Sequence, residues 1–219
     1  MIQPCTIIHV VLLFCIEQKV DFARARLKFK DARLEKSNAS ILDAALVAFA
    51  ENPDTTFTEI SKIAGVGRAT LYRMYATRES LIEALLLKCL DKLDVEMSKA
   101  ESNSLSLKHF FELFFITIIN LENEYKLMLK LDLEKCSSEA VRKRCSKQEQ
   151  EMEELVESAK HEGLIDKNTP TKWVIHLIDG LIYSSWEFNS SQNDSTFVAK
   201  MATKSLLTGV GKASFFGKK

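Results

Sequence analysis

Apolar side chains recur every three or four residues along most of this chain, which is the period of an amphipathic helix. The first such segment covers residues 40–51 and ends at a turn sequence around the proline of residues 52–54. A short helix is predicted after Thr56 and another over residues 68–75, with Gly65 between them as the helix breaker. The N-terminal part of the chain is therefore predicted to be a three-helix unit.

The same period continues through the rest of the sequence. Thr77 is predicted to open a long helix that reaches about residue 100. Gly163 is predicted to end one helix, and Asp194 to cap the last one. Further helices are predicted over residues 105–123, 125–133, 138–162, 170–189 and 195–209. Only seven glycines and three prolines interrupt 219 residues, which favours an all-α fold.

The expected organisation is an N-terminal helix-turn-helix domain followed by a larger helical bundle. We expect a poorly ordered extension with a basic arm, then the helix-turn-helix domain, the larger helical bundle, and a frayed tail. The corresponding ranges are 1–36, 37–83, 84–210 and 211–219.

The charge balance and the apolar runs of the chain indicate whether it binds nucleic acid or a membrane. Thirty basic and thirty acidic residues give a formal net charge of zero, which argues against coating nucleic acid by bulk charge. Basic residues nevertheless gather in segment 24–36, which is either an arm that reaches DNA or a solvated leader. The apolar run at residues 5–16 is too short to span a bilayer and no basic residue precedes it, so we expect no membrane attachment.

The chain lacks the motifs of the common enzyme classes. It has no glycine-rich phosphate loop, no G-x-S-x-G and no HExxH, and its four histidines are scattered. Its five cysteines are odd in number with no CxxC pair, as expected of reduced cytoplasmic thiols. We therefore expect no catalytic residue, no cofactor and no metal, in a cytoplasmic protein that is not an enzyme.

The segment around Gly65 has what a helix-turn-helix requires. Thr56 and Glu59 have the spacing of a capping box, Ser61 is small enough for two helices to approach, and Leu71 can clamp the second helix onto the first. The second helix would then enter a major groove with its N-terminal residues. Of its exposed side chains, Arg68 suits a guanine edge and Arg73 a phosphate. The residues predicted to meet DNA are Thr56, Gly67, Arg68, Ala69, Thr70, Tyr72, Arg73 and Arg78.

Two stretches, ILDAALVAFAE and TFTEISKIAGVGRATLYRMYATRESLIEAL, resemble the DNA-binding domain of the tetracycline-repressor (TetR) family. The resemblance covers residues 40–87 and rests on T-x-x-x-I, AGV, LYR-x-Y and R-E-x-L at the family's offsets. Two positions depart from the pattern: Gly67 stands where Ser is usual, which removes a capping hydroxyl, and Ser61 stands where Ala is usual. The resemblance implies a recognition helix with Arg68, and Arg78 at the phosphate-anchoring start of the next helix.

The resemblance also implies that the remaining helices bind an effector and dimerise. The expected dimer surface is formed by the helices over about 171–189 and 195–207, and the alternative is that both are core helices of a monomer. The expected partners are a palindromic double-stranded operator, a second copy of the chain and an unidentified small hydrophobic ligand. The predicted ligand pocket is lined by Phe111, Phe114, Phe115, Tyr125, Met128, Trp173 and His176.

Three alternatives remain open from sequence alone. A helical protein-interaction module that does not bind DNA would share the helical pattern, an enzyme would require an unrecognised motif, and an activator would share every DNA-binding residue with a repressor.

Overall fold

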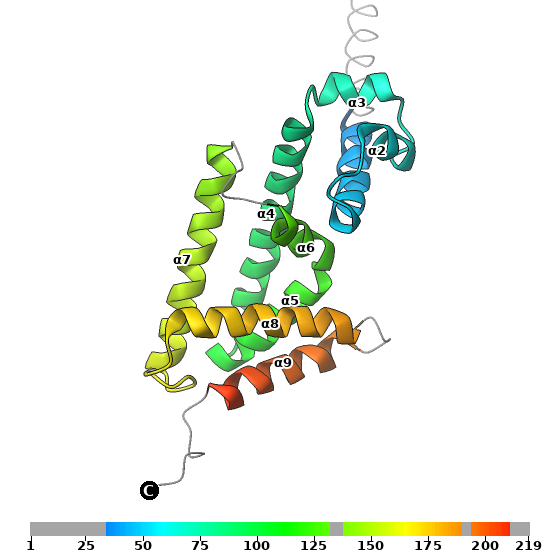
Figure 1. The fold of residues 1–219 in the computed structure, drawn as a ribbon. Helices are drawn as coiled ribbons and strands as arrows, with labels where there is room; N and C mark the ends of the chain where they lie inside the picture. The colour runs from blue at the N-terminus through cyan, green and yellow to red at the C-terminus, as the bar shows by residue number, and fades with distance from the viewer. Residues whose placement is uncertain (1–33, 132–137, 190–193, 211–219) are drawn as a thin grey trace, which may run out of the picture. The chain divides into compact units, whose positions relative to one another are not determined.

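The computed structural model describes residues 34–131, 138–189 and 194–210, and all its regular elements are helices (Figure 1). The predicted extension up to residue 33 and the predicted tail 211–219 lie outside the described residues. Residues 34–51 form a helix that we call the leading helix. Its labelled successors are α2 (Phe57–Ile63), α3 (Arg68–Met74), α4 (Arg78–Asn103), α5 (Leu107–Asn120), α6 (Glu122–Lys130), α7 (Glu139–His161), α8 (Thr171–Asn189) and α9 (Ser195–Gly209).

The leading helix is longer than its predicted range of 40–51, because residues 34–39 are also helical. The predicted range started at Ser40, and serine is a residue type that favours caps and turns. Within the helix, however, the Ser40 hydroxyl donates to the carbonyl of Lys36 at 3.0 Å, so its hydrogen bond is made inside the turn. Residues 34–36, which were assigned to the poorly ordered extension, therefore belong to this helix.

Contacts divide the chain into two compact units. The described part of the first unit comprises residues 34–45 and 55–76, and the second comprises residues 46–54 and the described residues from Thr77 on. The leading helix is continuous across this division, so that its last turn belongs to the second unit.

The first unit has a small core made from the leading helix, α2 and α3. Ile41, Ile60 and Leu71 are completely buried, one from each helix. Tyr75, directly after α3, is also buried, and its hydroxyl donates to the side-chain oxygen of Asn38 on the leading helix. These contacts orient α3 by its inner face and leave its outer face free for another role.

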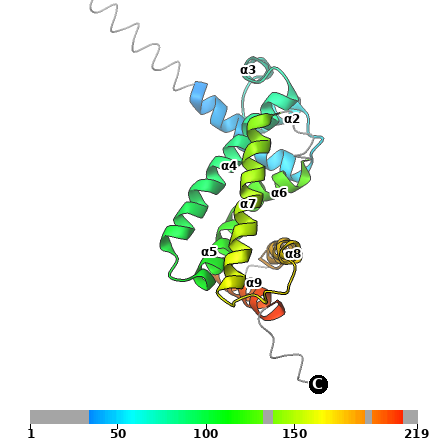
Figure 2. The ribbon, with the colours of Figure 1, turned by 90° about the vertical axis from the view of Figure 1, so that its left-hand side faces the viewer.

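The second unit is a helical bundle whose core is richest around α5. Phe111, Phe115 and Ile118 of this helix are almost fully buried, as expected where apolar residues occupy nearly every side of a helix. α8 and α9 pack side by side, as both views show, and both also contact α5 (Figures 1 and 2). Trp186 of α8 donates its indole N–H to the Ile118 carbonyl at 3.4 Å, which ties α8 to α5.

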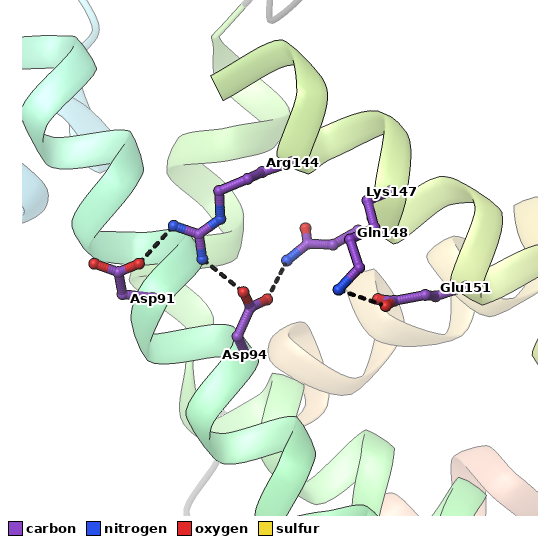
Figure 3. Close-up of polar contacts among 6 residues, drawn as sticks. All are labelled: Asp91, Asp94, Arg144, Lys147, Gln148 and Glu151. Carbon is purple, nitrogen blue, oxygen red and sulfur yellow. Dashed lines mark hydrogen bonds and ion pairs between the residues drawn. The ribbon is translucent and has the colours of Figure 1, made fainter. Parts of the chain in front are cut away.

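A polar network joins α4 to α7 on the surface of this bundle (Figure 3). The Arg144 guanidinium donates to Asp91 at 2.5 Å and to Asp94 at 2.6 Å. Gln148, one turn further along α7, donates to the second oxygen of Asp94 at 2.9 Å. A two-pronged arginine contact of this kind fixes orientation as well as distance.

The predicted helix over 105–123 is wrong at its end, because the chain turns at Leu121 and α6 starts at Glu122. The Leu121 amide donates to the carbonyls of Thr117 and Ile118, at 3.0 and 3.2 Å, and its side chain is buried. No glycine or proline marks this turn, so the residue pattern contained no signal for it.

Candidate nucleic-acid interface

The entry to the helix-turn-helix is the capping box predicted at Thr56. The Thr56 amide donates to the Glu59 carboxylate at 2.7 Å, and the Glu59 amide donates to the Thr56 hydroxyl oxygen at 3.3 Å. The Thr56 hydroxyl also donates to the Glu59 carboxylate, at 2.7 Å. The two hydrogen bonds that this carboxylate accepts, from the Thr56 amide and hydroxyl, lower the pKa of Glu59. Thr56 is thus occupied in starting α2, which fixes the direction of that helix.

The turn between α2 and α3 is built on Gly65, which has a φ of +64°. The Gly65 amide donates to the Lys62 carbonyl at 3.2 Å, and the Val66 amide donates to the Ser61 carbonyl at 3.0 Å. This pair of bonds is the Schellman arrangement that ends helices at a left-handed residue. The turn therefore requires the conformation that glycine adopts without steric cost.

Two side chains set the packing of α2 against α3. Ser61 is buried, as expected for a small residue between two helices. Ile63 follows the buried Ile60 at helical spacing, yet it is 60% exposed. Phe57, at the start of α2, is buried instead, and its ring lies 5.1 Å from that of Tyr72. Because Phe57 follows the cap directly, the sequence pattern had assigned it to no face.

α3 has one buried side and one exposed side. Leu71 is fully buried and holds the helix to its unit. Arg68, Ala69, Tyr72 and Arg73 are exposed, and Thr70 is half-buried. Gly67 precedes the helix without any side-chain cap, in agreement with the missing hydroxyl noted from the sequence. Five of the predicted DNA contacts are therefore carried together by one short helix.

A groove of about 450 Å³ lies beside this helix within the first unit. Ser37 of the leading helix, Gly65 and Gly67 of the turn, and Thr70 and Arg73 of α3 are among the residues that line it. The predicted contacts Gly67, Thr70 and Arg73 thus share one concave surface with the turn.

Arg78, the eighth predicted DNA contact, lies in the second unit, at the first position of α4. Its guanidinium carbon is 4.5 Å from the centre of the Phe49 ring, near the end of the leading helix. An arginine in this position gains a cation–π contact. Arg78 therefore already makes one contact that sequence reasoning missed, because the two residues are far apart in the chain.

The predicted ligand-pocket residues separate into two groups. Phe111, Phe114 and Phe115 are buried, and Tyr125 and Met128 pack against the same core. Trp173 is 63% exposed, and His176 is exposed on the same helix. The structure therefore does not place Trp173 and His176 with the buried aromatic residues. Both lie on the outer side of α8, whose inner side is formed by Val174, Ile178 and Ile182.

Beside the buried aromatics lies one polar contact between α6 and α8. The Tyr125 hydroxyl donates to the Asp179 carboxylate at 3.3 Å, and the Tyr125 ring is 5.7 Å from that of Trp186. Burial raises the pKa of Asp179, and it also raises the pKa of Tyr125. A half-buried carboxyl among aromatic rings is the kind of polar group that orients a ligand in an apolar site.

Within the described ranges, no group of three or more His, Cys, Asp or Glu side chains is arranged to hold a metal ion. Among the described helices, none is long and apolar enough to cross a bilayer.

Residues 41–85, which contain most of the leading helix, α2, the turn, α3 and the start of α4, match the family model described as bacterial regulatory proteins of the tetR family. This N-terminal segment of the chain belongs to the TetR family. The family match covers α3 and the Gly65 turn completely, so the helix-turn-helix predicted from the sequence is confirmed.

Among curated proteins, the chain is similar to the HTH-type transcriptional repressor LfrR of Mycolicibacterium smegmatis (strain ATCC 700084 / mc(2)155). The two are 34% identical over 70 residues, which is 32% of this chain and 37% of LfrR. The matched segment thus spans less than half of that relative.

Solved TetR-family structures resemble most of the chain in fold. The structure of LfrR from Mycobacterium smegmatis in complex with proflavine has a TM-score of 0.65 at 20% identity, covering 83% of this chain and 99% of that one. A TetR-family regulator from Marinobacter aquaeolei VT8 has a TM-score of 0.68 at 18% identity, covering 84% and 100%. The ketosteroid regulator KstR2 of Mycobacterium tuberculosis has a TM-score of 0.66 at 17% identity, covering 80% and 95%. The all-α fold, with an N-terminal helix-turn-helix and a larger helical bundle, is thus shared along most of the chain.

Proposed function

We propose that this protein is a cytoplasmic transcriptional repressor that binds a palindromic DNA operator as a homodimer and leaves it when a small hydrophobic ligand binds the bundle. The observation that carries the proposal is the two-sided character of α3. Its buried Leu71 fixes the helix, while Arg68 and Arg73 extend from its exposed side. A short helix presented in this way fits a major groove.

Within this proposal the residues of α3 have separate roles. Arg68, at the N-terminus of the helix, would read a guanine edge, and Thr70 would contact a base edge or a thymine methyl group. Tyr72 and Arg73 would contact phosphates, which fix register without reading sequence. Thr56 and Gly67 would contribute through the placement of α2 and α3, since Thr56 is engaged in its capping box and Gly67 has no side chain.

A homodimer is supported by the exposed face of α8 and α9. Large apolar or aromatic side chains remain exposed there, and a contiguous patch of this kind marks an interaction surface. They are Trp173, Tyr183, Phe188, Phe197 and Met201, each between 44% and 63% exposed. Gly180 lies on the same exposed side of α8, and nothing lies within 4 Å of a side chain added there. Two copies of the pair could pack as a four-helix bundle. A dimer is also what a palindromic operator requires, since its half-sites bind two recognition helices about 34 Å apart.

The ligand site is proposed beside the buried aromatic residues of α5 and α6. Phe111, Phe115 and Met128 supply apolar surface, and Tyr125 with Asp179 supplies the polar contact. One structure of similar fold, that of LfrR, contains proflavine. That ligand belongs to LfrR, and for this chain we propose only that a hydrophobic molecule occupies the bundle and favours a conformation with lower operator affinity.

The test is selection of bound duplexes from a random pool with the full chain, followed by affinity measurements on the selected duplex. The Arg68→Ala, Arg73→Ala double variant should lose at least about tenfold in affinity while remaining folded, because loss of the Arg68 base contact costs about 1–3 kcal/mol and loss of the Arg73 phosphate contact weakens binding further. The matched control is Lys99→Ala, Lys108→Ala, which removes the same charge from exposed positions on the bundle. Equal affinity of both double variants for the selected duplex would contradict the proposal, and failure to select any duplex would favour a protein-interaction module.

A further inference from the structure

The last turn of the leading helix is held by two cations from elsewhere in the second unit. The carbonyls of a final helical turn have no partner within the helix. Here the Lys130 ammonium donates to the carbonyl of Ala50 and, at 3.2 Å, to that of Glu51. One residue before Ala50, the ring of Phe49 is covered by Arg78. A positive charge at this end also interacts favourably with the helix dipole.

Lys130 is the final residue of α6, a nine-residue helix whose side chains reach α4, α8 and the leading helix. Glu124, buried in α6, pairs with Lys92 of α4 at 2.5 Å. Tyr125 donates to Asp179 of α8 beside the proposed ligand site. Lys130 then reaches the leading helix, five residues after Tyr125. One short and regular helix therefore connects the bundle interior with the end of the helix that begins in the DNA-binding unit.

We propose that Lys130 is a positioning residue that couples the bundle to the DNA-binding unit by capping the leading helix. The inference rests on the proposed function and adds the residue through which α6 acts on that helix. A movement of α6 about the Tyr125–Asp179 contact would shift or release the cap. Because residues 34–51 form one continuous helix, loss of the cap loosens an element shared by both units.

The experiment compares the full chain with Lys130→Met, which keeps the length of the side chain but removes its charge, and with Lys130→Arg, which restores two donors. Lys99→Met is the matched control, since Lys99 is an exposed lysine that pairs with Glu96 of its own helix. In Lys130→Met, amide hydrogen exchange over residues 46–51 should accelerate about fivefold. This factor corresponds to losing the stabilisation that a positive charge gives to the C-terminal end of a helix. Peptides from α5 and α9 should be unchanged, and Lys130→Arg should restore the original rate.

Affinity for the selected duplex separates positioning from direct DNA contact. Lys130→Met should bind about fivefold more weakly, with Lys130→Arg close to the original chain. The slope of log affinity against log salt should not change, whereas loss of a phosphate contact lowers it by about one. Unchanged exchange in Lys130→Met, unchanged affinity, or a reduced salt slope would each overturn the assignment. If the original chain selects no duplex, the proposed function fails and the coupling role fails with it. The exchange rates would then show whether the cap itself is real.

Discussion

Gly65 offers the sharpest quantitative test of the turn that orients α3. Its φ of +64° is left-handed, and no atom lies within 4 Å of a side chain added at this position. A Gly65→Ala change should therefore cost only the backbone penalty of a left-handed alanine, about 1–2 kcal/mol of unfolding free energy, with no added clash. Gly65→Asn should cost less, because asparagine tolerates this conformation better than alanine does.

The assay is urea unfolding of the full chain, followed by circular dichroism and by tryptophan fluorescence. Gly163→Ala is the matched comparison, because Gly163 has a φ of +76° and equally open surroundings, so it should cost the same amount. Gly180→Ala in α8 should instead stabilise the folded monomer by up to about 1 kcal/mol, because alanine favours a helix interior more than glycine does. An unchanged free energy of unfolding in Gly65→Ala would refute the left-handed turn. A loss of unfolding free energy well above that of Gly163→Ala would show that the added side chain does clash.

Three further results are expected. A double-mutant cycle of Arg144→Met with Asp94→Asn should give a coupling of about 0.5–1 kcal/mol that shrinks in high salt, as expected for a partly exposed ion pair, and additive effects would contradict the contact in Figure 3. Burial raises the pKa of Asp179 above its ordinary value of 3.8. The buried charged carboxylate therefore destabilises the folded chain, an effect that is absent in acid, where the carboxyl is protonated, and that grows as pH rises through the raised pKa. Asp179→Asn should then raise the melting temperature at pH 7 but not at pH 3, and an Asn variant that melts lower at pH 7 would count against this reasoning. Trp173→Glu should weaken self-association at least about tenfold in sedimentation without unfolding the chain, and an intact dimer would remove Trp173 from the interface.

Local signals in the sequence predicted the helix ends well. The capping box at Thr56, the left-handed Gly163 and the cap at Asp194 all occur as predicted. Each depends on residues within four positions of one another, so the sequence alone contains the necessary information. The turn at Leu121 has no such signal, because it arises where a buried leucine must pack in the bundle core.

Contacts between residues that are distant in the chain could not be predicted from the sequence. α8 is apolar on several sides, and its period alone could not decide which side faces the core. The structure turns Val174 and Ile178 inward, and consequently Trp173 and His176 outward. The Lys130 cap on the leading helix joins residues 79 and 80 positions apart, and nothing in either segment predicts it.

The central claim is that α3 reads the major groove, and guanine methylation interference on the selected duplex tests it most directly. Methylation of guanine N7 blocks the groove edge that arginine recognises. The account predicts two groups of interfering guanines about one helical turn apart, one in each half-site, with one guanine of each group lost in Arg68→Ala. No interfering guanine, or a pattern that Arg68→Ala leaves unchanged, would contradict it.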